Sequence, residues 1–367
     1  MRTKLMVPGP VDVDGEVLAE MARPMEAHYG PEWARLHWET VGMAKRVFCT
    51  ENELFVLVGS GTAAIEAAIG SAIGGGAKPL IVVNGGFGER LSAVVSSYTG
   101  DLNVLRFPED RPFPPEAVED ALGKDPGIGM VAAVHCETMT GVLNPVRELG
   151  EVCRRRDVVF MVDAVSTLGG AEFRTDDWGI DLCATASQKC LEAPPGLGLV
   201  SVSERAWDVI SKSKGPGWYL NLNIWRKYAE NWEDWHPFPV TMAVPAFKAL
   251  KRSLEMILEE GLETRWERHR RASALLREGM RKFGLEPFVP DEWASPTVTS
   301  ILPPDGLSPE DIIEYVRKRH GIRLAGGIGK YEGKVFRVGH MGPGATEAAV
   351  AGVLRAVEDA LGTLGGG

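Results

Sequence analysis

The sequence predicts an α/β protein whose core is a mostly parallel sheet covered by helices on both faces. Two observations lead to this prediction. Between about residues 50 and 205, short apolar runs alternate with segments of helical pattern, as in doubly wound folds. The runs are also continuous rather than interrupted by polar residues, which is typical of strands buried on both faces. With 367 residues, the chain is long enough for a second, smaller domain.

The expected strands of this sheet follow one another through the first half of the chain. A helix is expected from Thr62 and another at Glu89–Ser97, each directly after a strand. Because ligands of such sheets bind beyond the carboxyl ends of the strands, the polar residues that follow each strand are expected to form one cleft. The strands are Leu54–Val58, Leu80–Val83, Met130–Val134, Val158–Val162, Leu182–Ala186 and Leu199–Val202.

The second half of the chain has a different pattern. Residues 206–240 are rich in tryptophan and are expected to be irregular. We expect an N-terminal arm at residues 1–20, a large domain at 21–250 and a smaller α+β domain at 251–367. A serine before a proline predicts the start of the helix at Ser308. The expected elements are helices at Val244–Glu260, Glu263–Phe283, Ser308–His320 and Ala345–Leu361, and strands at Ser295–Leu302 and Lys334–Val338.

The composition excludes several classes of protein. A net charge of -10 argues against binding to nucleic acid or to an anionic membrane surface. No apolar stretch approaches the roughly 20 residues that cross a bilayer, and the N-terminus has no signal-peptide pattern. The five cysteines are odd in number, scattered and without a CxxC pair, so we expect no metal site and a cytoplasmic location.

Lys189 is the first candidate for catalysis. It follows the apolar run of residues 182–186 and precedes a Pro194-Pro195-Gly196 turn. Desolvation at a strand end lowers the pKa of a lysine, and the resulting free amine forms a Schiff base with a carbonyl cofactor or substrate. An exposed lysine after a strand is the commoner explanation of such a residue by itself. The neighbouring strand ends therefore decide between the two interpretations.

Two clusters near other strand ends suggest a phosphate and a flat ring. Ser60-Gly61-Thr62 follows a strand and opens a helix, where free N–H groups and hydroxyls bind a phosphate. The same segment also serves as an ordinary turn and N-cap. Phe87, in the glycine-rich segment 84–90, could stack on a planar ring or simply pack in the core.

Asp163 ends the most apolar of the runs, and a carboxylate there needs a partner. A protonated ring nitrogen would serve, with Val165 as an apolar floor and Thr138 as a hydroxyl beside the ring. Capping of a following helix is the alternative role for Asp163. A phosphate site, a stacking ring, a carboxylate and a Schiff-base lysine are together what pyridoxal 5'-phosphate requires.

With these residues in place, the chain resembles the class V, alanine/serine–glyoxylate/pyruvate aminotransferase-like branch of the fold-type I pyridoxal-phosphate enzymes. The matching segments follow the family's order through nearly the whole chain. They are Val7–Pro10, Gly59–Ala67, Asn84–Arg90, His135–Gly141, Val162–Ser166, Ala186–Gly196 and Phe336–Gly342.

The resemblance implies a fold-type I transferase with a seven-stranded type of sheet, and it implies a role for each site residue. Lys189 and Asp163 would be catalytic, with Lys189 as the Schiff-base lysine and Asp163 as the partner of the ring nitrogen. Arg337 would hold the substrate carboxylate, and Gly9 and Tyr29 would add to the substrate site. The cofactor-binding residues would be Ser60, Gly61, Thr62, Phe87, Thr138, Asp163, Val165, Gln188, Lys189 and Thr241.

The resemblance also implies a homodimer that shares its active sites. Thr241 would reach the phosphate of the neighbouring subunit, whereas the tyrosine that often accompanies it is replaced by Phe238. Near the N-terminus, His28-Tyr29-Gly30 stands where family members often carry His-Arg-Ser, so Tyr29 would shape the substrate pocket. The implied reaction moves an amino group from alanine or serine to glyoxylate or pyruvate by a ping-pong mechanism.

Other activities stay open at this point. The segments around Cys190 and Arg337 also resemble pyridoxamine–pyruvate aminotransferase, although that enzyme lacks the phosphate cup that Ser60–Thr62 forms here. A lyase or a cysteine desulfurase is a weaker alternative, because no cysteine follows Cys190 to supply a mobile catalytic thiol. A binding protein without activity is disfavoured by the intact set of Lys189, Asp163 and Arg337.

Overall fold

The computed structural model describes residues 3–74 and 76–365. In this part of the chain, seven strands form one sheet in the order β2-β10-β9-β8-β5-β3-β4. The strand β10 runs antiparallel to both of its neighbours, and the other pairs are parallel. The mostly parallel sheet is therefore confirmed. The strands are β2 (Glu53–Val58), β3 (Lys78–Val83), β4 (Asn103–Arg106), β5 (Ile128–Val134), β8 (Val159–Asp163), β9 (Leu182–Ala186) and β10 (Leu197–Val202).

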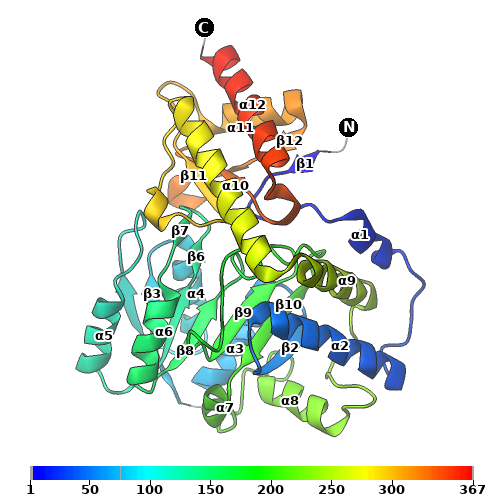
Figure 1. Ribbon diagram of the computed structural model, residues 1–367. Helices are drawn as coiled ribbons and strands as arrows, with labels where there is room; N and C mark the ends of the chain where they lie inside the picture. The colour runs from blue at the N-terminus through cyan, green and yellow to red at the C-terminus, as the bar shows by residue number, and fades with distance from the viewer. Residues whose placement is uncertain (1–2, 75, 366–367) are drawn as a thin grey trace.

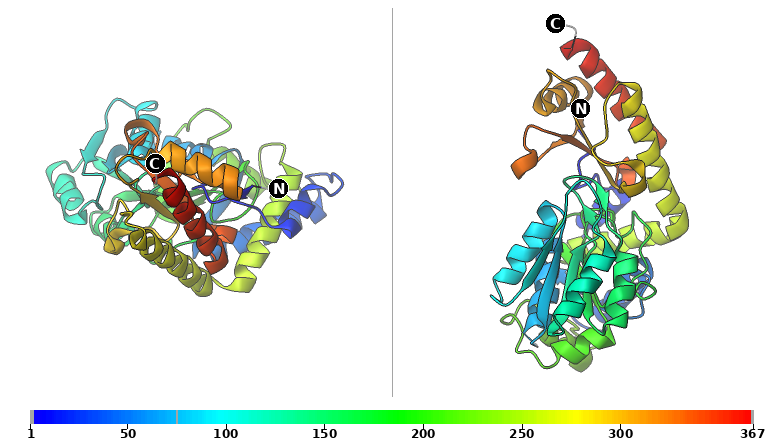
Figure 2. Two further views of the ribbon diagram at one scale, coloured as in Figure 1. Left: turned by 90° about the horizontal axis from the view of Figure 1, so that it is seen from above. Right: turned by 90° about the vertical axis from the view of Figure 1, so that its left-hand side faces the viewer.

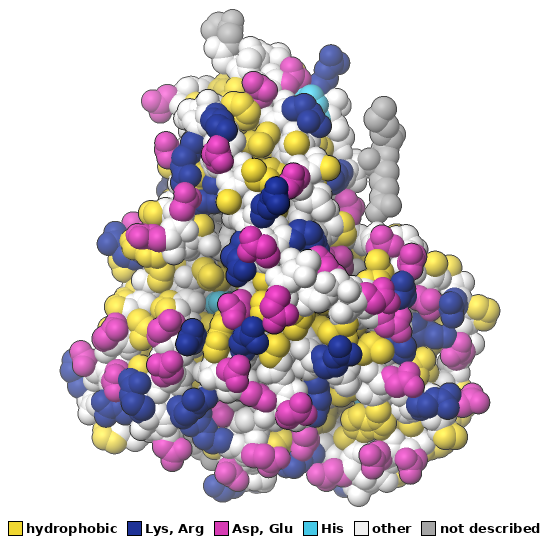
Figure 3. All heavy atoms as spheres, viewed as in Figure 1, with side chains coloured by type: hydrophobic (Ala, Val, Ile, Leu, Met, Phe, Trp, Pro, Cys, Tyr) yellow, Lys and Arg dark blue, Asp and Glu magenta, His cyan; other side chains and the backbone are white. Residues whose placement is uncertain are grey.

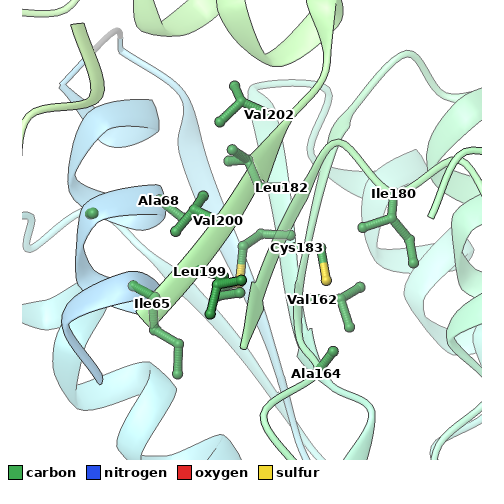
Figure 4. Close-up of a cluster of buried hydrophobic side chains, with 14 of the residues drawn as sticks. Ile65, Ala68, Val162, Ala164, Ile180, Leu182, Cys183, Leu199, Val200 and Val202 are labelled. Carbon is green, nitrogen blue, oxygen red and sulfur yellow. The ribbon is translucent and has the colours of Figure 1, made fainter. Parts of the chain in front are cut away.

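Helices cover this sheet and bury its apolar side chains (Figure 1). Ala68 of α3 and Val200 of β10 belong to one cluster of buried side chains (Figure 4), and both are fully buried. Side chains without polar atoms fill such a helix–sheet contact and hold the start of α3 at the sheet edge. The helices are α2 (Pro31–Phe48), α3 (Gly61–Ile73), α4 (Gly86–Ser96), α5 (Pro115–Lys124), α6 (Val146–Arg155), α7 (Glu204–Ile210), α8 (Leu222–Asn231) and α9 (Val244–Glu260).

The expectation that residues 206–240 are irregular is wrong for two parts of that segment. The helices α7 and α8 lie there, and each begins at a side-chain cap: Ser203 accepts from Ala206 N and Asn221 accepts from Asn223 N. Trp207 and Trp225 are buried on these helices. The tryptophans therefore anchor short helices to the body of the protein, an outcome that their irregular spacing did not indicate.

A second, smaller body contains the C-terminal third of the chain. Its strands β11 (Val298–Ile301), β14 (Phe336–Gly339) and β13 (Ala325–Gly326) form an antiparallel sheet. The helices α10 (Leu262–Lys282), α11 (Pro309–His320) and α12 (Glu347–Leu364) lie beside it, and α10 connects the two bodies in Figure 1 and Figure 2. Ser308 caps α11 as predicted.

The N-terminal segment contacts both bodies: its strand joins the second body, and the helix that follows packs against α9 of the first. Strand β1 (Lys4–Leu5) pairs in parallel with β12 (Ile322–Arg323), and Met6 is buried in the second hydrophobic core. Helix α1 (Gly15–Met21) follows. The expected boundary between residues 250 and 251 falls inside α9, whose Leu254 and Ile257 still pack in the core of the large body. We propose that the smaller domain begins near the start of α10.

The surface carries both signs of charge. Lysine and arginine side chains alternate with aspartate and glutamate over the face seen in Figure 3. Such mixing gives this face no extended basic field of the kind that binds nucleic acid. Within the described residues, the helices include none that combines the length and the apolarity needed to cross a bilayer.

Candidate active site

Two cavities meet at Lys189 within the described part of the chain. The inner cavity, of about 220 Å³, is lined by Ser60–Thr62, Phe87, Asp163, Val165, Gln188 and Lys189 among others. The outer cavity, of about 450 Å³, is lined by Val7–Gly9, residues 323–328 and Arg337. Phe87, Thr138 and Lys189 line both cavities, so a molecule in one lies next to a molecule in the other.

The lysine at this junction is buried. Desolvation lowers the pKa of Lys189 to about 8, although the nearby Cys190 and Cys136 thiols and the Asp163 carboxylate act in the opposite direction. Its Nζ donates a hydrogen bond to the carbonyl oxygen of Pro8. A Cβ at Gly9 would lie 2.9 Å from Nζ, so only glycine leaves room for the amine at that position. The unprotonated fraction of the amine near neutral pH is therefore far larger than for an exposed lysine, although the protonated form still predominates at pH 7.

Asp163 stands at the carboxyl end of β8 with 7% of its surface exposed. One carboxylate oxygen accepts a hydrogen bond from Val165 N at 2.9 Å. Burial raises the pKa of the carboxyl to about 6, while that hydrogen bond and the positive charges of Lys189 and Arg90 lower it. The alternative role as a helix cap is not what the structure contains, because a turn rather than a helix follows Asp163. A cation in the inner cavity would relieve the desolvation of this carboxylate.

The start of α3 forms the anion-binding end of the inner cavity. Ser60 caps the helix by accepting from Ala63 N, and the first turn contains no acidic residue. Gly61 is packed so closely that a Cβ would lie 3.0 Å from Val165 and from Ala186. The buried Oε1 of Gln188 has no hydrogen-bond partner among the described residues. Because backbone N–H groups and the helix dipole attract an anion, this helix N-terminus without an acidic residue favours a phosphate.

Phe87 is held by a carboxylate behind it. Glu137 accepts hydrogen bonds from the backbone N–H groups of Phe87, at 3.1 Å, and Gly88, at 2.6 Å. Burial raises the pKa of Glu137 to about 7 against the effect of these two bonds. Arg90 lies over the other side of the Phe87 ring, 4.9 Å from its centroid. The ring is thus fixed at the wall that both cavities share.

Arg337 is a buried guanidinium in the outer cavity. Its Nε donates to the carbonyl oxygen of Gly326 at 2.9 Å and its Nη1 donates to that of Thr138 at 3.1 Å. Desolvation lowers the pKa of Arg337 to about 10. In the residues that the structure describes, no carboxylate forms an ion pair with it. A buried and unpaired guanidinium is suited to a carboxylate that arrives with a substrate.

The structure does not bring every predicted residue to these cavities. Thr241 is exposed and lines neither of them, and Tyr29, 53% exposed, packs near Trp235 beside a different depression. Sequence reasoning missed Arg90 and Ser166 in the inner cavity, although both lie inside segments that it singled out. Ser166 hydrogen-bonds Thr138 at 2.7 Å and so belongs to the wall of the cavity.

Known proteins agree with this geometry. The model of the aminotransferase class-V family matches residues 20–333. An uncharacterised aminotransferase of Methanocaldococcus jannaschii is 41% identical over 98% of this chain and 93% of its own length. The structure of alanine–glyoxylate aminotransferase from Nostoc is similar with a TM-score of 0.93 and 33% identity, covering 98% of this chain and 96% of that chain. The structure of pyridoxamine–pyruvate aminotransferase from Mesorhizobium loti has a TM-score of 0.94 and 30% identity, covering 100% and 93%.

Fold and site together define a fold-type I enzyme that depends on pyridoxal 5'-phosphate. The chain belongs to the class V aminotransferases, and it is a transaminase. The residues of the inner cavity fit the cofactor: a helix N-terminus without an acidic residue suits its phosphate, and a buried carboxylate suits its ring nitrogen.

Proposed function

We propose that the enzyme moves an amino group from a small amino acid, alanine or serine, to glyoxylate or pyruvate in two half-reactions at one site. One observation carries the proposal: the buried amine of Lys189, with its lowered pKa, lies where the inner and outer cavities meet, and Arg337 lines the outer cavity without a carboxylate partner among the described residues. The similarity to alanine–glyoxylate aminotransferase supports the choice of substrates.

Different residues of the inner cavity would hold the phosphate, the ring and the ring nitrogen of the cofactor. Ser60, Gly61, Thr62 and Gln188 would bind the phosphate at the start of α3. Phe87 and Val165 would contact the ring, and Thr138 would lie beside it. Asp163 would accept the proton on the ring nitrogen, since a carboxylate in this buried position gains most from a cationic partner. When bound, pyridoxal 5'-phosphate supplies a carbonyl for amine exchange and a ring that accepts the electrons of the Cα–H bond.

The proton transfer falls to Lys189. When a substrate amine takes its place on the cofactor, the freed Lys189 amine would remove the proton from the substrate Cα as a general base. It would then return that proton on the cofactor side as a general acid. A pKa of about 8 serves both directions near neutral pH. Arg337 would hold the substrate carboxylate so that the Cα–H bond stays within reach of Lys189. The hydrogen bond to Pro8 gives the lysine a defined position between these steps.

We also propose a homodimer in which residues of one subunit complete the site of the other. Thr241 and Tyr29 are exposed and lie outside both cavities of their own chain. An exposed threonine can reach the phosphate of a partner subunit, and Tyr29 would then border the partner's substrate. The five cysteines, all free, favour the cytoplasm as the compartment in which the enzyme works.

Transfer between pyridoxamine and pyruvate is the second candidate, since the similarity to pyridoxamine–pyruvate aminotransferase has a TM-score of 0.94. The N-terminus of α3, which has no acidic residue in its first turn, favours a bound phosphate and therefore the first candidate. A purified protein that holds no cofactor but converts pyridoxamine with pyruvate would reverse this order.

Lys189→Ala tests the proposed function directly. The variant should lose both turnover of alanine with glyoxylate and the visible absorption of the bound cofactor, while the exposed Lys212→Ala keeps both. If Lys189→Ala retained the absorption and the turnover, the assignment of the lysine would be wrong. A panel of amino acids, each mixed with the cofactor-loaded enzyme and scored for conversion of the cofactor to its amine form, would then define the donor.

A further inference from the structure

A second arginine lines the outer cavity besides Arg337. Arg323 belongs to β12, and in the described part of the chain it forms no ion pair and no side-chain hydrogen bond. It is exposed to the cavity rather than buried. By contrast, Arg317 on the neighbouring helix α11 forms an ion pair with Glu314 at 2.7 Å. Arg323 therefore lines the cavity with a positive charge that no carboxylate among the described residues neutralises.

The strand pattern places Arg323 on the same side as Arg337. Ile322 and Leu324 are buried in the second hydrophobic core. Because side chains alternate along extended chain, Arg323 and Ala325 point away from that core. Ala325 pairs directly with Arg337 across the sheet. Two residues of extended chain span about 7 Å, so the two arginines stand a short distance apart along one wall of the cavity.

The charge of this cavity is one-sided. Lys189, Arg323 and Arg337 line it, and the described lining residues include no aspartate or glutamate. Its volume of about 450 Å³ is within the range of about 300–1,000 Å³ in which ligand pockets commonly fall. A substrate as small as alanine, held by its carboxylate at Arg337, would leave the part of the cavity around Arg323 unfilled.

We propose that, beyond alanine and serine, the enzyme also accepts and prefers donors that carry a second anionic group, a carboxylate or a phosphate monoester, at the end of the side chain, and that Arg323 recognises that group. The inference rests on the proposed function and names a substrate class for the same site. Arg337 takes the carboxylate next to the reacting carbon, and Arg323 takes the distal anion. Because the two half-reactions share one site, a dianionic donor is compatible with a small acceptor such as glyoxylate.

Donor kinetics test the proposal. With glyoxylate as acceptor, kcat/KM is measured for alanine, aspartate, glutamate and O-phosphoserine, so that the carboxylate and phosphate arms are separate. At least one dianionic donor should exceed alanine by about tenfold or more, as expected for one charge-assisted contact. Arg323→Gln should remove that advantage and leave alanine within about twofold, while Arg323→Lys, which keeps the charge, should retain part of it.

Two comparisons keep the outcome unambiguous. The exposed Arg319→Gln on α11, outside the cavity, should leave all four donors unchanged. Calorimetry with glutarate should show weaker binding to Arg323→Gln than to the wild-type enzyme. An enzyme that uses alanine but prefers no dianion, or an Arg323→Gln variant that loses alanine and dianions equally, would overturn the proposal. An enzyme that takes an amino group from none of the donors would instead contradict the proposed function.

Discussion

The inner and outer cavities differ in how the chain builds them. The inner cavity is lined by residues at the ends of neighbouring strands of one sheet and at the start of α3, all within the large body. The outer cavity is assembled from the N-terminal segment, the strands of the smaller body and the shared wall at Phe87 and Lys189. The first arrangement suits a cofactor that stays the same in every turnover. The second suits substrates that enter and leave.

This difference predicts that changes in the inner cavity affect all substrates equally. Asp163→Asn would leave the ring nitrogen of the cofactor with a neutral partner in a buried position. We expect kcat/KM to fall roughly 100- to 1,000-fold, the usual effect of breaking a buried charge pair, and to the same degree for every donor. Steady-state kinetics with the four donors check this, with the exposed Asp208→Asn as the control. A loss confined to some donors would contradict the assignment of the inner cavity to the cofactor and the outer cavity to the substrates.

The desolvation of Lys189, where the two cavities meet, should make the free energy of unfolding of the cofactor-free protein depend on pH. The pKa of Lys189 falls from 10.5 to about 8 on folding, so the unfolded chain binds more protons between these values and stability rises with pH across that window. Below pH 8 the full penalty applies, roughly 3 kcal/mol. Lys189→Met should therefore stabilise the cofactor-free protein at pH 7.

The gain from Lys189→Met should shrink as the pH rises from 8 to 10.5 and vanish above that range, where the wild-type amine is neutral in both states. Urea unfolding at pH 7 and at pH 10 measures the difference. The exposed Lys212→Met is the matched control and should show no such trend. A gain that stays constant with pH would mean that the lysine is not desolvated.

Changes in the outer cavity should act on substrate binding. Arg337→Gln removes the charge that holds the carboxylate common to all substrates, and we expect kcat/KM to fall about 100-fold, mainly through KM. The value of kcat/KM should fall for all donors, whereas Arg323→Gln is predicted to lower it only for dianionic donors. Measurement of kcat and KM separately distinguishes the two arginines. A fall in kcat alone would assign Arg337 to the chemical step instead.

The smallest effect is expected at the wall between the cavities. Glu137→Gln replaces a carboxylate that accepts from two backbone N–H groups with an amide whose nitrogen cannot accept. One N–H then loses its partner, which should lower the free energy of unfolding by about 1–3 kcal/mol. Glu89→Gln, in an exposed ion pair with Arg106, should cost less than this in the same urea titration. Equal losses would show that Glu137 has no special part in holding Phe87.

The two cavities also differ in how far the sequence predicted them. The inner cavity follows from continuous apolar runs, because the ends of buried parallel strands converge: Asp163, Lys189 and Ser60 lie together as expected. The strand β4 was not predicted, because its residues are only partly buried and do not form a continuous apolar run. The outer cavity depends on contacts between segments far apart in the chain. Gly9 and Arg337 came only from the family resemblance, and Arg323 was missed.

A local signal for Arg323 does exist in the sequence. Ile322, Leu324 and the charged residue between them alternate as a half-buried strand does. Alternation alone shows that Arg323 leaves the core, but not whether it faces solvent or a cavity. Only the pairing of Ala325 with Arg337 decides that point. The pairing is a tertiary contact, which local patterns do not contain.

The hydrogen bond between Pro8 and Lys189 has a consequence for how the enzyme is made. The two residues are 181 positions apart, and the segment before Pro8 is held by pairing with Ile322. Contacts between such distant positions form late, since the intervening chain must first be ordered. During synthesis on the ribosome, the lysine therefore emerges well before the strand that fixes its neighbour. The amine of Lys189 therefore lacks its hydrogen bond to Pro8 until the polypeptide is nearly complete.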